Sequence, residues 1–123
     1  MPHLTLEYSA NLGEVHASDL LLKLNQSLML SGEFNEIDIK SRALRFDQVC
    51  VGTTPAQRGF VDVKLAILQG RSLSTRQALS AGLLEVLKQN LRPDAALDTQ
   101  ICVEVQEIER DSYSKHHYVL SQN

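Results

Sequence analysis

The sequence predicts an α+β fold, in which two successive strand-helix-strand units form a four-stranded mixed sheet with two helices on one face. Three observations predict this fold class. Apolar residues alternate in strand-length runs, leucines recur at helical spacing in two longer stretches, and each half shows the same order of elements. The halves cover about residues 2–50 and 59–108 and share this pattern with negligible sequence identity. At 123 residues, the chain is expected to form a single domain over residues 1–123.

The first unit begins directly behind the start of the chain. Apolar and polar residues alternate strictly from His3 to Tyr8, which predicts a half-buried strand. Leucines then recur at helical spacing from Leu20 to Leu28, which predicts a helix with Ser18 as its N-cap. The first unit therefore runs from strand to helix within about 30 residues.

The second strand carries an irregularity. Ile37 and Ile39 are expected to open it, but further along the apolar residues move to the other parity, at Leu44 and Phe46. One inserted residue near positions 41–43 would account for that change, so the pattern predicts a bulge or bend there.

The second unit repeats the pattern. Alternation from Val61 to Ile67 predicts a third strand, and Ser74 to Gln77 fits a capping box at the start of a second helix. Pro93 is expected to end that helix. The run from Ile101 to Val105 then predicts a fourth strand.

The face of the sheet away from the helices also needs a cover. Its candidate residues are mixed in polarity, which favours burial against another subunit over exposure to water. The sequence therefore predicts a homo-oligomer.

Composition and charge argue against several classes of protein. A formal net charge of -3 gives no basic stripe for nucleic acid, and no apolar run is long enough to span a bilayer. The start of the chain lacks the apolar segment of a signal peptide, so a cytoplasmic protein is expected. Cys50 and Cys102 are too few and too far apart for a disulfide framework or a zinc site, and His116-His117 has no third ligand nearby in sequence. No metal is expected.

Pro2 is the residue with the clearest chemical potential, because only Met1 precedes it. Removal of Met1 would leave a free secondary amine at the start of the first strand. An α-amino group titrates near about pH 8, and burial or nearby cations lower that value. A terminal proline is then neutral near physiological pH and can act as a base that its ring holds in place. With Met1 retained, Pro2 is an amide without a basic lone pair.

Three short segments carry a family resemblance. Pro2-His3, Ile39-Lys40-Ser41-Arg42 and Gly70-Arg71-Ser72-Leu73 stand in an order and spacing similar to those of the 5-carboxymethyl-2-hydroxymuconate isomerases of the tautomerase superfamily. The resemblance extends from Pro2 to about Tyr118. It implies a tautomerase-like fold, a homotrimer, a small anionic substrate, and a role in the degradation of the aromatic compound homoprotocatechuate. It implies no metal or organic cofactor.

The resemblance also implies site residues. The terminal proline that serves as general base falls on Pro2, and an arginine that binds carboxylate falls on Arg71. A second cationic position falls on Lys40, where related proteins carry arginine. Lysine cannot form the planar fork that guanidinium makes with a carboxylate, so either Lys40 or Arg42 is expected to bind substrate. If the third strand runs antiparallel to the first, its end lies beside Pro2 and brings Arg71 to the same edge.

The expected reaction is the shift of a double bond in an unsaturated hydroxy-dicarboxylate such as 5-carboxymethyl-2-hydroxymuconate, with Pro2 as acid and base and Arg71 stabilising the dienolate. Two alternatives stay open. One is keto-enol tautomerisation of a simpler pyruvate derivative. The other is a non-catalytic trimeric module that binds an anion or a protein, should Met1 be retained. The sequence leaves open the physiological substrate and the subunit that supplies each cation.

Overall fold

The centre of the fold is an antiparallel pair of strands, β1 (His3–Ser9) and β3 (Arg58–Leu68). In the computed structural model, which describes residues 1–121, β2 (Lys40–Phe46) pairs with β1 in parallel, and β4 (Asp98–Ile108) pairs with β3 in parallel. The sheet order is β2-β1-β3-β4. This arrangement confirms the predicted four-stranded mixed sheet.

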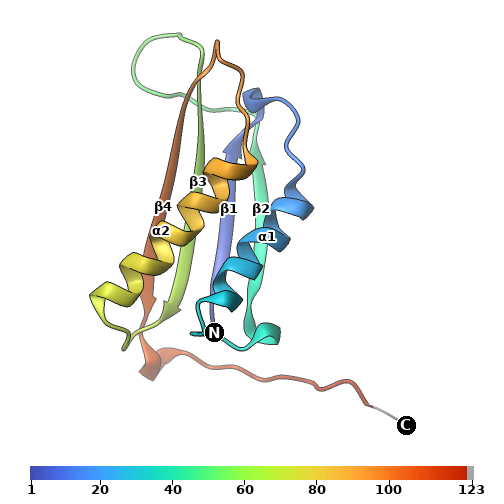
Figure 1. The fold of residues 1–123 in the computed structure, drawn as a ribbon, viewed down its shortest axis with the longest axis vertical. Helices are drawn as coiled ribbons and strands as arrows, with labels where there is room; N and C mark the ends of the chain where they lie inside the picture. Colours follow the sequence, from blue (N-terminus) through green and yellow to red (C-terminus); the bar gives the residue numbers. More distant parts are fainter. Residues whose placement is uncertain (122–123) are drawn as a thin grey trace.

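Two helices cover one face of this sheet (Figure 1). Helix α1 (Ala17–Leu30) connects β1 to β2, and α2 (Leu73–Asn90) connects β3 to β4. Short 3-10 turns occupy Ala10–Leu12, Glu36–Asp38 and Arg110–Ser112. The two strand-helix-strand units are therefore related as predicted, with both helices on the same side.

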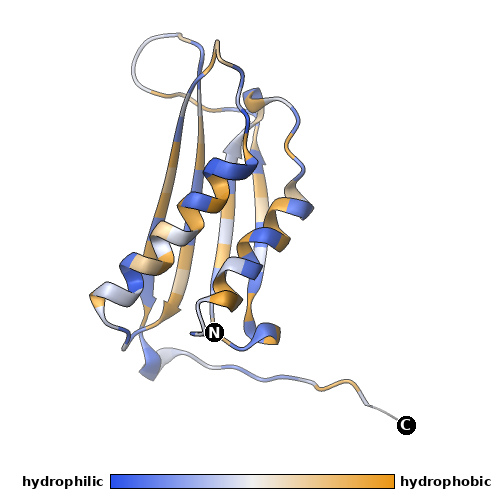
Figure 2. Cartoon of the chain, viewed as in Figure 1, coloured by the Kyte–Doolittle hydropathy of each residue, from blue (hydrophilic) through white to orange (hydrophobic). Residues whose placement is uncertain are grey.

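The core lies between the helices and the inner face of the central strands. Figure 2 shows apolar residues alternating with polar ones along the strands. Burying one leucine or isoleucine side chain contributes about 1.5–3 kcal/mol, so this layer is the main source of stability. The most deeply buried aliphatic side chains are Leu4, Leu6, Leu24, Val63, Leu65, Ile67, Leu83 and Leu87.

The cap of each helix lies two residues before the predicted cap. Helix α1 begins at Ala17, and His16 occupies the cap position without a side-chain hydrogen bond, so the Ser18 prediction is wrong. In α2, Ser72 is the cap, since its side chain accepts from the Thr75 amide at 3.2 Å. The predicted capping box at Ser74 is therefore also wrong.

The reason for the early start of α2 is the turn before it. Gly70 has φ +125, a conformation that glycine adopts without the cost it imposes on other residues. The chain leaves β3 at this residue and reaches helical geometry at Leu73, which leaves Ser72 as the last extended residue. The same turn carries Arg71.

The predicted bulge in the second strand is absent from the structure. Pairing of β2 with β1 runs without interruption from His3 opposite Lys40 to Ser9 opposite Phe46. The change in apolar parity instead reflects a change of face, because Leu44 and Phe46 lie on the outer face of a regular strand, while Ile37 lies in the 3-10 turn Glu36–Asp38 and is exposed. Ile39, the residue after that turn, is buried.

Among the described residues, both helices lie on the same face of the sheet and leave the outer face uncovered by helix (Figure 1). Ion pairs cross it, with Lys64 Nζ 3.0 Å from Glu7 Oε1 and 3.6 Å from Asp62 Oδ2. Large apolar side chains also remain accessible there, since Leu44 is 51% and Phe46 37% exposed. Within residues 1–121, no helix has the length and apolar character that crossing a membrane requires.

Candidate active site at the N-terminal edge of the sheet

The start of β1 and the ends of β3 and β4 lie together at one end of the strands, which we call the N-terminal edge of the sheet. His3 lies opposite Ala66 in the antiparallel pairing, so the residues before His3 extend toward the end of β3. On the other side, His3 lies opposite Lys40, and the Lys40 amide donates to the Pro2 carbonyl at 3.2 Å. The predicted proximity of the Pro2 end to the turn with Arg71 follows from this register.

The start of the chain lies in a partly desolvated, cation-rich place. Pro2 is less than 2% exposed and Met1 is half-buried. Burial lowers the pKa of the Met1 amino group, Asp38 raises it, and the cations of Arg71, Lys40 and Lys115 lower it further. The net effect at this position favours a neutral amine.

Arg71 is held firmly beside this position. Its Nε donates to Glu33 Oε1 at 2.9 Å, its Nη2 donates to the Glu33 carbonyl at 3.0 Å, and its Nη1 donates to the Leu68 carbonyl at 3.5 Å. The guanidinium also lies 4.6 Å from the centroid of the Phe34 ring. An arginine has five N–H donors, and these contacts use three of them. The rest are free to meet an anion.

Lys40 and Arg42 have different surroundings, although both lie on β2. Lys40 Nζ donates to the Asp38 carbonyl at 2.8 Å and lies 3.2 Å from Met1 Sδ, so its ammonium lies against the first residue of the chain. Arg42 Nη2 instead lies 3.3 Å from His3 Nδ1. Of the two cations, the structure places Lys40 against the start of the chain.

His3 is a structured neighbour of the site. Because arginine can only donate, the Arg42 contact makes His3 Nδ1 the acceptor, and His3 Nε2 then carries the proton toward the Tyr113 hydroxyl at 3.4 Å. Burial lowers the pKa of His3, and Arg42 and Lys40 lower it further. The neutral imidazole fits both contacts.

Four residues at this edge were not identified from the sequence: Glu33, Asp38, Tyr113 and Lys115. Lys115 Nζ lies 2.9 Å from Asp38 Oδ1, and this hydrogen bond is the main reason that the pKa of Asp38 is lowered. A sequence signal for Tyr113 and Lys115 existed. Parallel pairing of the third and fourth strands makes the segment after β4 leave the sheet at the edge where Pro2 lies.

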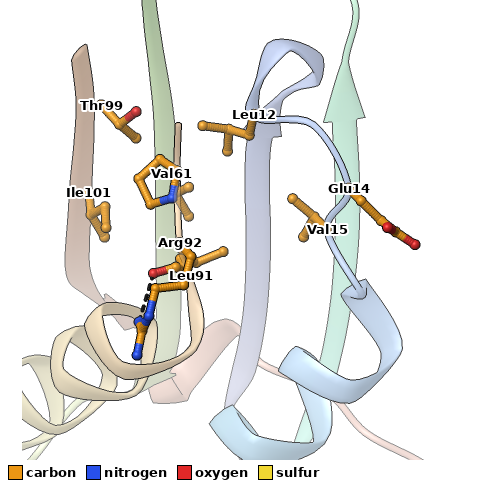
Figure 3. A pocket seen from close by; sticks show the side chains of 9 residues that line it. Leu12, Glu14, Val15, Val61, Leu91, Arg92, Thr99 and Ile101 are labelled. Atoms are coloured by element: carbon orange, nitrogen blue, oxygen red, sulfur yellow. Dashed lines mark hydrogen bonds between the residues drawn. The ribbon is translucent and has the colours of Figure 1, made fainter. Parts of the chain in front are cut away.

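A pocket at the opposite end of the sheet is a separate feature (Figure 3). It lies among Leu12, Val15 and Ile101, with Glu14 and Arg92 as its charged residues. Its cavity volume is about 20 Å³, room for about one water molecule. It is too small for a dicarboxylate and contains none of the predicted site residues. Within residues 1–121, no group of three or more metal-ligating side chains is found.

Comparisons with known proteins agree with this arrangement. The family model of 5-carboxymethyl-2-hydroxymuconate isomerase matches residues 2–121. A solved 5-carboxymethyl-2-hydroxymuconate isomerase from Deinococcus radiodurans R1 is 30% identical, with a TM-score of 0.78 over 95% of this chain and 90% of that chain. The sequence has no significant match among the curated proteins.

More distant structures show the same fold. A macrophage migration inhibitory factor-like protein from Entamoeba histolytica is 14% identical, with a TM-score of 0.67 over 94% of this chain and 96% of that chain. A fused 4-OT solved as a symmetric trimer is 18% identical, with a TM-score of 0.68 over 95% of this chain and 94% of that chain. These matches confirm the tautomerase-like fold expected from the sequence.

Proposed function

Because the chain belongs to the 5-carboxymethyl-2-hydroxymuconate isomerase family, we propose that it shifts a double bond in an unsaturated hydroxy-dicarboxylate such as 5-carboxymethyl-2-hydroxymuconate. Family membership itself supports an isomerase; the substrate and the residue roles are the proposal. The observation that carries it is the burial of Pro2 at an edge where the cations of Arg71, Lys40 and Lys115 all lower the pKa of the adjacent Met1 amine.

Pro2 is the proposed acid and base once Met1 has been removed. Its neutral amine takes a proton from one carbon of the substrate, and the resulting ammonium returns that proton to another carbon while the double bond moves. The proton is conserved over the cycle, so the step needs no oxidant, reductant or cofactor. A pKa near ambient pH serves both halves of the cycle, and burial and the same cations already lower the pKa of the Met1 amine, one residue from Pro2.

The cations have separate proposed roles. Arg71 stabilises the negative charge that develops on the dienolate oxygen, because its guanidinium is held in place before the reaction begins. Lys40 binds a substrate carboxylate as a point charge. Arg42 is the weaker candidate for that role, since its guanidinium contacts His3, whereas the Lys40 ammonium lies against Met1.

A homotrimer is the proposed assembly. The outer face carries accessible apolar side chains such as Leu44, and one solved structure of the same fold is a symmetric trimer. Light scattering is expected to give three times the mass of the chain, and a stable monomer contradicts this assembly. We further propose a role in homoprotocatechuate breakdown, as the family resemblance implies, and a cytoplasmic location.

A simpler substrate is the second candidate. Glu33 already neutralises part of the charge of Arg71 and occupies its donors, which favours a substrate with fewer carboxylates. Keto-enol tautomerisation of a pyruvate derivative would need only the Pro2 amine and one cation. Comparing kcat/KM for phenylenolpyruvate with that for 5-carboxymethyl-2-hydroxymuconate decides between the two.

The experiment that tests the role of Pro2 compares two matched chains. Intact-mass measurement first establishes that Met1 is absent from the wild type. A second chain carries one alanine between Met1 and Pro2, so removal of methionine leaves Ala-Pro2 and an amide at proline. The fold accommodates this extra residue because Met1 already occupies that position, half-buried.

Ultraviolet absorbance then follows isomerisation of 5-carboxymethyl-2-hydroxymuconate. We expect activity in the processed wild type and its loss in the Ala-Pro2 chain, with the same circular dichroism for both. Equal activity in the two chains refutes Pro2 as the base. Retention of Met1 on nearly every chain made at natural levels favours the non-catalytic alternative.

A further inference from the structure

The C-terminal segment after β4 crosses the edge of the sheet at which the chain begins. Figure 1 shows this segment passing beneath the N-terminus. At its start, Arg110 Nε donates to the Gln69 carbonyl at 2.8 Å. Next, the Tyr113 hydroxyl lies 3.4 Å from His3 Nε2. The segment thus passes from the end of β3 to the start of β1.

Lys115 is the last residue of this segment with a side-chain contact to the sheet edge. Its Nζ lies 2.9 Å from Asp38 Oδ1, directly before β2. Beyond it, Tyr118 is 90% and Leu120 87% exposed. Figure 2 shows that most of the segment is hydrophilic, so polar contacts determine its course.

The ammonium of Lys115 belongs to the same electrostatic environment as the first residues. Together with Arg71 and Lys40, it lowers the pKa of the terminal amine, and it also lowers the pKa of His3. Three structural elements therefore bring cations to one place. Lys40 comes from β2, Arg71 from the turn before α2, and Lys115 from the C-terminal segment.

The other two cations already have roles in the proposed reaction. Arg71 is assigned to the dienolate oxygen and Lys40 to the first carboxylate, and Arg71, like Lys115, already pairs with a carboxylate of the protein. Lys40 is engaged by the Asp38 carbonyl at 2.8 Å. Lys115 uses one side-chain contact, whereas an ammonium has three donors on a flexible four-carbon stem. Its partner Asp38 shows that a carboxylate fits at this position.

We propose that Lys115 is a substrate-binding residue that takes one carboxylate of the dicarboxylate substrate while it keeps its contact with Asp38. This rests on the proposed function, and it assigns the C-terminal segment a share in substrate recognition. Asp38 uses one of the three N–H donors of the ammonium, so the substrate carboxylate gains a charged hydrogen bond from another donor. A substrate without that second carboxylate gains nothing from Lys115.

The first test compares Lys115→Met and Lys115→Arg with the wild type, with Lys88→Met as the matched control. Lys88 is an exposed lysine of α2 that pairs with Glu85 at 3.6 Å. Losing a hydrogen bond between charged groups predicts a rise of about tenfold to a hundredfold in KM for the dicarboxylate in Lys115→Met. Lys115→Arg retains most of the affinity, and Lys88→Met leaves KM unchanged. An unchanged KM in Lys115→Met overturns the proposal.

Asp38→Asn separates binding from tethering. This variant weakens the pair that holds the segment but leaves the Lys115 ammonium present. If Lys115 binds substrate, KM for the dicarboxylate does not rise in Asp38→Asn. If the pair serves only to tether the segment, Asp38→Asn and Lys115→Met raise KM equally, and that result overturns the proposal.

Binding of an unreactive probe keeps this test independent of the proposed reaction. Glutarate, a saturated dicarboxylate, and butyrate, its monocarboxylate counterpart, are titrated into each chain and followed by NMR. We expect Lys115→Met to weaken glutarate binding selectively. An inactive wild type that shows this selective loss refutes the proposed reaction and supports the role of Lys115. Equal glutarate affinity in wild type and Lys115→Met, or no binding by the wild type, overturns it.

Discussion

Replacing Arg71 by alanine is the most informative perturbation of the proposed active site. The guanidinium is 19% exposed, stacks on Phe34 at 4.6 Å, and is held by Glu33 through two hydrogen bonds. It is therefore positioned before substrate arrives. Removing one preorganised donor from a site of developing negative charge costs about 10²–10³-fold in kcat. We expect Arg71→Ala to lose activity by that factor.

The structural cost of the same change is smaller. A partly exposed ion pair contributes about 0.2–1 kcal/mol, and an exposed cation–π contact about 0.5–1 kcal/mol. With the hydrogen bond from Arg71 to the Glu33 carbonyl, the loss of stability is about 1–3 kcal/mol. A typical domain has about 5–15 kcal/mol of stability, so the variant stays folded.

Glu33→Gln is the matched control. It removes the ion pair that restrains Arg71 but keeps the guanidinium, its contact with the Glu33 carbonyl and its stacking on Phe34. We expect a stability loss of at most about 1 kcal/mol and activity within a few-fold of wild type.

The assay measures kcat and KM from the ultraviolet change of the substrate, beside urea unfolding of each variant. A drop in kcat for Arg71→Ala with normal folding supports its role at the reacting oxygen. Activity of Arg71→Ala within threefold of wild type refutes the reasoning. An equal loss of activity in Glu33→Gln would also refute it, because the effect would then follow the ion pair.

Three further changes test the environment of this edge. The Asp38 carboxylate raises the pKa of the Met1 amine, and we expect it to act with the same sign on the Pro2 amine of the processed chain. Asp38→Asn therefore moves the acidic limb of kcat/KM against pH to lower pH, and an unmoved limb contradicts the assignment. Burial and the Arg42 cation hold the pKa of His3 below its usual value of 6.5. The unfolded chain therefore binds this proton more tightly than the folded chain, and the free energy of unfolding falls as the pH drops below 6.5. His3→Gln removes that part of the slope, which urea unfolding at about pH 5.5 and about pH 7.5 measures; an identical slope in both chains counts against it. Gly70→Ala forces alanine to φ +125 and costs about 1–3 kcal/mol in unfolding free energy, although the added Cβ meets only Arg110 at an ordinary 3.6 Å; an unchanged melting temperature would show that the turn carries no such strain.

Much of the fold could be predicted because the local spacing of apolar residues identifies its strands and helices. Alternation identified β1 and β3, and helical spacing of leucines identified α1 and α2. The exact starts of the helices could not be predicted, since a cap is the residue at which the preceding turn ends. In α2 that depends on Gly70 and selects Ser72 over Ser74.

The second strand shows another limit of local patterns. Its parity change was interpreted as a bulge, but Leu44 and Phe46 are apolar residues on the outer face of a regular strand. A bulge and an apolar outer face both move the apolar residues to the other parity. Only the unbroken pairing with β1 distinguishes them.

The meeting of Pro2 and Arg71 at one edge followed from the sequence, because strand order and direction bring the start of the first strand to the end of the third. The tertiary structure alone showed that Glu33 restrains Arg71 and that Lys115 reaches Asp38. These contacts join residues far apart in the chain over distances near 3 Å. Periodicity places a residue on a face or at an end of a strand, whereas a hydrogen bond requires the side-chain positions that only the folded chain specifies.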